Sequence, residues 1–136
     1  MSVVYQATQA AVTSATYPGT PGSVPQVRRF VREFFSDSPR AYELELISAE
    51  LATNAIRHTP SGERGGTFRV TIWRQTGHAR LEVRDLGSAM WVPALRESDY
   101  PAEHGHGLEV VTALADEVGH DATPGQGQVV WAVLTW

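Results

Sequence analysis

Glu50 and Asn54 are the residues whose types and spacing best suit chemistry in this 136-residue chain. Residues four positions apart lie on one face of an α-helix, about 40° apart around its axis. A carboxylate can accept a proton, and carboxylate or amide oxygens can bind a hard cation. One helix face therefore offers proton transfer beside a cation site. The alternative is a solvated helix flank.

The helix that carries this pair is predicted from about residue 41 to residue 58. Its apolar stripe, at helical spacing, consists of Leu44, Ile47, Leu51 and Ala55. At about 100° per residue, Glu50 and Asn54 fall beside this stripe, at the rim of the core. A polar side chain at that position is unfavourable unless it has a partner.

A second candidate group is Asp85, which ends a strand of alternating apolar residues. Leu81 and Val83 share one parity and Asp85 continues it, so its carboxylate is predicted to point to the buried side. There it can accept a hydrogen bond from an amine, such as the exocyclic amine of adenine. Gly87 would let a flat ring approach the backbone closely. The alternative is an Asp-X-Gly turn that follows a strand.

A third candidate is the segment in which Gly105 and Gly107, followed by Leu108, open a predicted helix. Glycines at a helix N-terminus leave backbone N–H groups free to face an anion, and the helix dipole adds a favourable potential. The segment lacks the Lys-Ser/Thr of a Walker A loop and the wider Rossmann fingerprint. Phosphate binding is one interpretation, and simple helix capping is the alternative.

These groups are expected to be held by an α+β fold. The predicted architecture is a two-layer α/β sandwich, in which three helices cover one face of a mixed, mostly antiparallel sheet. The expected elements, in chain order, are a helix over 23–35, the helix over 41–58, strands near 68–72 and 81–83 joined by a hairpin at 75–78, a helix over 107–118, and strands at 118–122 and 128–134.

The composition is that of an ordinary soluble domain, with 42% hydrophobic and 19% charged residues. A net charge of −4 argues against nucleic acid as a direct partner, and the lack of cysteine excludes disulfides and thiolate metal sites. No apolar run reaches the roughly 20 residues that span a bilayer, and no secretory signal opens the chain. We therefore expect no membrane association and a cytoplasmic location. Residues 1–15 are expected to be a disordered tail or to contain an edge strand.

The order and placement of the three motifs resemble those of the Bergerat-fold (GHKL) ATPases. Glu-x-x-x-Asn on a helix, Asp-x-Gly ending a strand, and Gly-x-Gly-Leu opening a helix are similar to that family's N-box, G1 box and G2 box. The resemblance covers about residues 20–136 and is closest to the bacterial anti-sigma factor serine/threonine kinases. Residues 23–32, 50–58 and 129–132 also resemble that subgroup. It implies that residues 16–136 form an ATP-binding kinase-like domain.

The resemblance implies a role for each candidate residue. Asn54 would coordinate the Mg²⁺ that bridges the ATP phosphates, and Glu50 would be the general base that takes a proton from the attacking hydroxyl. Asp85 would bind the adenine amine, with Gly87 beside the ring. Residues 88–104 would form a short ATP lid. The backbone N–H groups presented to the phosphates would be those of Gly105, Gly107 and Leu108.

The same resemblance implies the partners. The protein would bind a sigma factor and would transfer the γ-phosphate of ATP to an anti-anti-sigma (antagonist) protein, and a homodimer is a further expectation. One alternative is a nucleotide-binding module that sequesters a protein partner without kinase activity, and another is a domain that binds no nucleotide. The ATP-binding half of a histidine kinase is disfavoured, because no phospho-accepting histidine helix pair precedes residue 41.

Three positions depart from the subgroup's pattern. Ala89 stands where a second glycine is common, Val129 where a threonine near the adenine is common, and His106 where an arginine is common. These changes are expected to weaken ATP affinity without abolishing it. A transition-metal site formed by His104 and His106 with another histidine is the less favoured interpretation of that segment.

Overall fold

The computed structural model of the protein describes residues 11–87, 105–123 and 127–136. Its elements, in chain order, are β1 (Ala11–Pro18), α2 (Ser23–Phe34), α3 (Ala41–His58), the short 3₁₀ helix η1 (Pro60–Gly62), β2 (Thr67–Gln75), β3 (His78–Gly87), α4 (Gly105–Leu114), β4 (Glu117–Thr123) and β5 (Gly127–Thr135).

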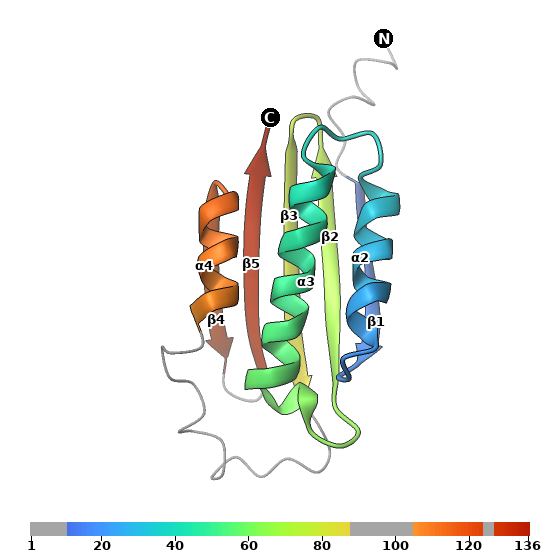
Figure 1. Ribbon diagram of the computed structural model, residues 1–136, viewed down its shortest axis with the longest axis vertical. Helices are drawn as coiled ribbons and strands as arrows, with labels where there is room; N and C mark the ends of the chain where they lie inside the picture. The colour runs from blue at the N-terminus through green and yellow to red at the C-terminus, as the bar shows by residue number, and fades with distance from the viewer. Residues whose placement is uncertain (1–10, 88–104, 124–126) are drawn as a thin grey trace.

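The strands form one sheet in the order β1-β2-β3-β5-β4, and the three helices lie on one of its faces (Figure 1). This confirms the predicted two-layer α+β sandwich. Every pairing among the described strands is antiparallel, so this part of the sheet contains no parallel pair. None of the described helices is both long and apolar enough to cross a membrane.

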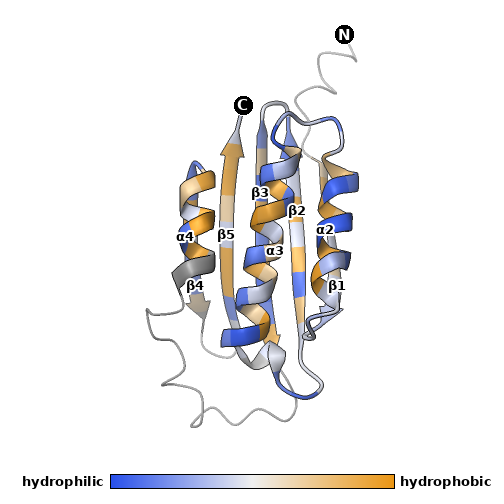
Figure 2. Ribbon diagram, viewed as in Figure 1, coloured by the Kyte–Doolittle hydropathy of each residue, from blue (hydrophilic) through white to orange (hydrophobic). Residues whose placement is uncertain are grey.

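The core lies between the helices and the sheet, and strand alternation supplies half of it. Phe68, Val70 and Ile72 of β2 are fully buried, as is Leu81 of β3. Strand β5 is hydrophobic along most of its length (Figure 2), and its Ala132 and Leu134 are fully buried in the core. The helical half of this core consists of Val27, Val31, Leu44, Ile47, Leu51, Ala52, Ala55 and Val111.

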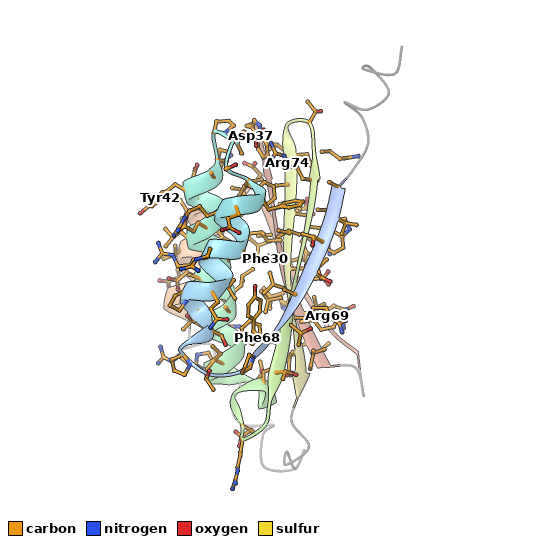
Figure 3. The ribbon with its side chains drawn as sticks, turned by 90° about the vertical axis from the view of Figure 1, so that its right-hand side faces the viewer. Phe30, Asp37, Tyr42, Phe68, Arg69 and Arg74 are labelled. Atoms are coloured by element: carbon orange, nitrogen blue, oxygen red, sulfur yellow. The ribbon has the colours of Figure 1, made fainter. Side chains whose placement is uncertain are left out.

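Aromatic side chains fill the layer between α2 and the β1–β2 edge of the sheet. Tyr17 stacks on Phe68 with ring centroids 5.7 Å apart, and it meets Phe30 edge-on at 6.4 Å. Figure 3 shows Phe30 and Phe68 between helix and sheet, with Arg69 on the opposite side of the sheet. Helix α2 is thereby fixed over the edge strand.

Two arginines bind the C-terminal ends of two helices at the same end of the molecule. Arg74 donates to the Phe34 carbonyl at the end of α2 (2.9 Å) and pairs with Asp37 (2.7 Å; Figure 3). Arg40 donates to the Leu114 carbonyl at the end of α4 (2.8 Å). A cation at a helix C-terminus satisfies otherwise unpaired carbonyls and complements the helix dipole.

The third predicted helix is shorter than expected. It was predicted to continue to Val118, but α4 ends at Leu114 and Val118 lies in β4, paired with Ala132. The Asp116 backbone N–H donates to the Val133 carbonyl at 2.9 Å, so the chain has already joined the sheet there. Apolar residues at helical spacing do not exclude a strand. Here residues from Glu117 onward pair with β5 instead of extending α4.

A buried carboxylate joins α2 to α3. Glu45 of α3 has a side chain only 10% exposed, and it accepts hydrogen bonds from Arg28 (3.1 Å) and from two nitrogens of Arg32 (2.7 and 3.0 Å). The hydrogen bonds from Arg32 are the largest of the effects that hold the pKa of the Glu45 carboxyl below its ordinary value.

Replacing Glu45 with glutamine is expected to lower the thermal midpoint by roughly 3–6 °C at pH 7. The effect stays modest because the Arg28 and Arg32 side chains are 42% and 57% exposed and remain solvated. A carboxyl with a lowered folded-state pKa contributes stability above its unfolded pKa, about 4.3, and loses it as the pH falls through the folded pKa. The melting curves of wild type and Glu45→Gln should therefore converge as the pH falls below the folded-state pKa of the Glu45 carboxyl.

The matched control is Glu117→Gln, which changes an exposed glutamate on β4. It should leave the thermal midpoint within about 1 °C of wild type at about pH 7 and at about pH 3. A Glu45→Gln deficit that is equal at about pH 7 and pH 3 would contradict the ion-pair explanation.

The sheet face opposite the helices carries a stack across three strands. By strand register, Trp73, Arg80 and Trp131 lie on this face. The Arg80 guanidinium carbon lies 5.2 Å from the Trp73 ring centroid and 4.6 Å from that of Trp131. The Trp131 ring also covers Gly119, where an added Cβ would meet the ring at 2.0 Å. A side chain at this position would require the Trp131 ring to move.

Candidate functional site

Segments far apart in the sequence meet at one end of the molecule (Figure 1). The C-terminal end of α3 with η1, the C-terminal end of β3, the N-terminal end of α4 and the start of β5 lie at the lower end of that view. Helix α3 contacts both β3 and α4, and η1 contacts β3. The elements that carry the three sequence motifs therefore come together.

Helix α3 holds Glu50 and Asn54 at the rim of the core. Both are half-buried, whereas Leu51 and Ala55 beside them are buried in the core. Within residues 11–87, 105–123 and 127–136, neither Glu50 nor Asn54 makes a side-chain hydrogen bond or ion pair with another residue. In the described part of the chain, this carboxylate and this amide, one helical turn apart, therefore do not hold α3 to another element.

Asp85 is buried at the end of β3, as the alternation predicted. Its exposed fraction is 4%, and it pairs in register with the core residue Phe68. A bulge separates the Thr67 and Phe68 positions of β2, so that Thr67 is opposite Gly87. The carboxylate thus lies inside the sandwich although it is only two residues from the end of the strand.

A fully buried hydroxyl lies against this carboxylate. Ser61 of η1 has no exposed surface, and its Oγ–H donates a hydrogen bond to Asp85 Oδ1. Sequence analysis placed residues 59–62 in a loop and did not assign Ser61 to the site. A Thr-Pro-Ser-Gly segment is typical of a turn, and only the fold brings it to a residue 24 positions away.

A chain of hydrogen bonds connects Asp85 to the last turn of α3. The Thr59 hydroxyl donates to the Ala55 carbonyl at 2.6 Å, and its Oγ1 accepts from the Ser61 backbone N–H at 3.0 Å. Ser61 then donates to Asp85. Because Ala55 follows Asn54 in the sequence, these bonds connect the helix of the Glu50/Asn54 pair to the buried carboxylate.

Two glycines hold this arrangement through backbone contact. A Cβ added at Gly19 would lie 1.7 Å from the Ser61 carbonyl oxygen, and one added at Gly127 would lie 2.1 Å from that of Asp85. Gly127 also has a φ of +77°, which glycine adopts without strain. Neither glycine was assigned to the site from the sequence, where both had only turn character.

The remaining predicted site residues lie at the same end. Gly87 is the last residue of β3, and Gly105, Gly107 and Leu108 lie in the first turn of α4. Leu108 is half-buried and packs against the core. The predicted lid, over residues 88–104, lies outside the described residues, as do Ala89 and the side chain of His106. The placement of Gly87 beside the adenine ring, and of the Gly105, Gly107 and Leu108 N–H groups against the phosphates, stays a prediction.

Val129, one of the three departures, is paired with Arg84 of β3. Arg84 and Asp85 are adjacent on an alternating strand, so their side chains point to opposite faces. By register, Val129 lies on the face of Arg84, and the sheet separates its side chain from the Asp85 carboxylate.

The donor set suits a hard cation better than a transition metal. Within the part of the chain that the structure describes, no three His, Cys, Asp or Glu residues gather into a metal-binding group. Mg²⁺ is usually held by one or two protein oxygens together with substrate phosphates and water. The amide oxygen of Asn54 beside the carboxylate of Glu50 fits that pattern.

These features define the class of protein. A five-stranded antiparallel sheet covered by three helices, with the three motifs at one end, is the architecture of a Bergerat-fold ATP-binding domain. More narrowly, the chain belongs to the family of the Histidine kinase-like ATPase domain, whose model matches residues 17–134. A search of curated proteins found no match. ATP with Mg²⁺ is the ligand that this class implies.

Proposed function

We propose that this domain is a Mg²⁺- and ATP-dependent protein serine/threonine kinase of the anti-sigma factor type. It would transfer the γ-phosphate of ATP to an anti-anti-sigma protein and would also bind a sigma factor. The observation that supports the proposal most directly is the pair Glu50 and Asn54. Both are half-buried, one turn apart, on a helix that hydrogen bonds connect to Asp85.

Under this proposal, Asp85 and Asn54 bind opposite ends of the nucleotide. The buried Asp85 carboxylate accepts a hydrogen bond from the adenine amine, and Gly87 leaves room for the ring. The Asn54 side-chain oxygen ligates the Mg²⁺ that accompanies the phosphates. Backbone N–H groups of Gly105, Gly107 and Leu108 face the phosphates, where the N-terminal end of α4 adds a favourable dipole.

Glu50 then removes a proton from the hydroxyl that attacks the γ-phosphate. ATP would supply the phosphoryl group with ADP as the leaving group, and bound Mg²⁺ would neutralise charge on the phosphates, so the protein has mainly to position the reactants. A carboxylate one turn from the metal ligand lies near the attacking oxygen and is held by a rigid helix rather than by a loop. Under this proposal, the acceptor hydroxyl is that of a serine or threonine on the partner protein.

The test combines the purified protein, γ-labelled ATP, Mg²⁺ and the anti-anti-sigma protein of the same organism. Label is expected on a serine or threonine of that partner, and none is expected when EDTA replaces Mg²⁺. Calorimetry with Mg-ATP on the same preparation measures nucleotide binding separately. ATP binding without any transfer would reject the kinase activity, whereas no binding at all would reject the whole proposal.

A second candidate function is a nucleotide-binding module that sequesters its partner without phosphorylating it. The observation that favours it is that Glu50 makes no side-chain hydrogen bond or ion pair with another described residue, so nothing in that part of the chain orients its carboxylate as a base. In the assay above, this function predicts a heat of ATP binding and an ATP-dependent complex with the partner, but no label on it.

A further inference from the structure

We propose that Ser61 is a positioning residue that sets selectivity for adenine by fixing the orientation of the Asp85 carboxylate. This inference rests on the proposed binding of ATP at this end of the molecule. It adds a residue to the site that lies on neither the N-box helix nor the strand of Asp85. It also specifies which part of the nucleotide that residue influences.

The direction of the hydrogen bond supports this role. An ionised carboxylate only accepts hydrogen bonds, so Ser61 must use its single O–H as donor to Asp85 Oδ1. A carboxylate can accept about four hydrogen bonds. One from Ser61 is therefore compatible with another from an exocyclic amine of a bound base. The serine and the amine would act together as donors to one acceptor group.

The position of Ser61 is itself fixed on several sides. Its backbone N–H donates to Thr59 Oγ1 at 3.0 Å, and its carbonyl oxygen packs against Gly19, leaving no room for a Cβ. The next residue, Gly62, packs equally closely on the backbone of α3, where an added Cβ would lie 1.8 Å from the Ile56 carbonyl oxygen. The donor is thus rigid before any ligand arrives.

A fixed donor matters because the χ2 torsion of an aspartate side chain has no strongly preferred angle unless a partner fixes it. The terminal χ2 torsion of aspartate is broad and roughly two-fold, so the plane of a carboxylate is set by its partners. Fixing that plane in advance reduces the entropy lost when a ligand binds. A site built to hydrogen-bond a substrate N–H also binds an analogue that lacks it less tightly, because one hydrogen bond to the carboxylate is then not formed.

The experiment compares ATP with purine riboside triphosphate, which has a hydrogen in place of the 6-amino group. Calorimetry gives the ratio of the two dissociation constants for each protein. In wild type the ratio is expected to favour ATP by about tenfold to about a hundredfold. In Ser61→Ala it is expected to fall to within about threefold of equality, mainly through weaker ATP binding. The analogue, which makes no hydrogen bond to Asp85, should bind nearly as well as before.

The matched control is Ser48→Ala, which removes another fully buried hydroxyl. Ser48 donates to the Glu45 carbonyl at 2.6 Å and makes no contact with Asp85 in the described structure. This variant should keep the wild-type ratio, whatever its thermal midpoint. A second variant, Ser61→Cys, fills the same space with a much weaker donor and should also reduce the ratio. If Ser61→Ala does not fold, Ser61→Cys still tests whether Ser61 sets the selectivity for adenine.

The outcomes separate the inference from the proposed function. If wild type binds ATP selectively and both Ser61 variants keep its ratio, the positioning role is wrong while ATP binding stands. If the Ser61 variants weaken both nucleotides equally, Ser61 supports the fold and not adenine selectivity. If wild type binds neither nucleotide, the proposed function and the inference fall together.

Discussion

Replacing Glu50 with glutamine is expected to slow phosphoryl transfer by about 10²–10⁴-fold, while the Kd for Mg-ATP changes by less than about threefold. Glutamine keeps the size and polarity of the side chain but cannot take up a proton. Removing a group used only in the reaction lowers the rate without weakening the bound state. Rates of label transfer to the partner under single-turnover conditions, with calorimetry for Kd, check this expectation.

The matched control is Glu43→Gln, which alters another carboxylate on the same helix two turns earlier. Glu43 pairs with Arg40 at 3.0 Å, far along α3 from the proposed site. It should transfer phosphate at the wild-type rate. If Glu50→Gln keeps full activity, Glu50 is not the base. If it loses ATP affinity tenfold or more, Glu50 acts in binding instead.

Replacing Asn54 with alanine is expected to weaken Mg-ATP binding by on the order of 10–100-fold. The physical reason is the loss of the one protein oxygen proposed for the metal. The decisive quantity is the ratio of Kd values with Mg²⁺ and with EDTA. Wild type should bind more tightly with Mg²⁺, whereas Asn54→Ala should bind about equally in the two conditions.

Thr53→Ala is the control, since it truncates the neighbouring half-buried polar residue, which lies about 100° away around the helix. It should preserve the Mg²⁺ dependence. Asn54→Ala with the wild-type dependence on Mg²⁺ would show that the metal ligand lies elsewhere, even if affinity had fallen. Thermal midpoints of both variants report whether either change disturbs α3.

The parts of this site that could be predicted from the sequence depend on local periodicity. The inward direction of Asp85 follows from strand alternation with Leu81 and Val83, and the structure buries it. The rim position of Glu50 and Asn54 follows in the same way from helical spacing. Both are properties of a single element, which a sequence window contains completely.

The parts that could not be predicted depend on contacts between distant segments. Ser61 reaches Asp85 only because η1 packs against β3. No pattern within residues 59–62 predicts this contact. Gly19 and Gly127 are required by backbone atoms of residues 42 positions away in each case, as the pairs Gly19–Ser61 and Gly127–Asp85 show. The boundary between the last helix and the next strand was predicted at Val118 for the same reason, since the partner that fixes this residue in the sheet, Ala132, lies in another strand.

The stack of Trp73, Arg80 and Trp131 on the sheet face opposite the helices determines which part of the protein tryptophan fluorescence can monitor. Trp73 and Trp131 lie on that face against Arg80, and Trp136 is 39% exposed at the chain end. No tryptophan of the described residues belongs to the buried core. Indole fluorescence from these residues therefore follows the outer surface of the sheet. Opening of the helix-to-sheet core is followed instead by Tyr17, which stacks on Phe68 there, and by the buried phenylalanines, which emit weakly.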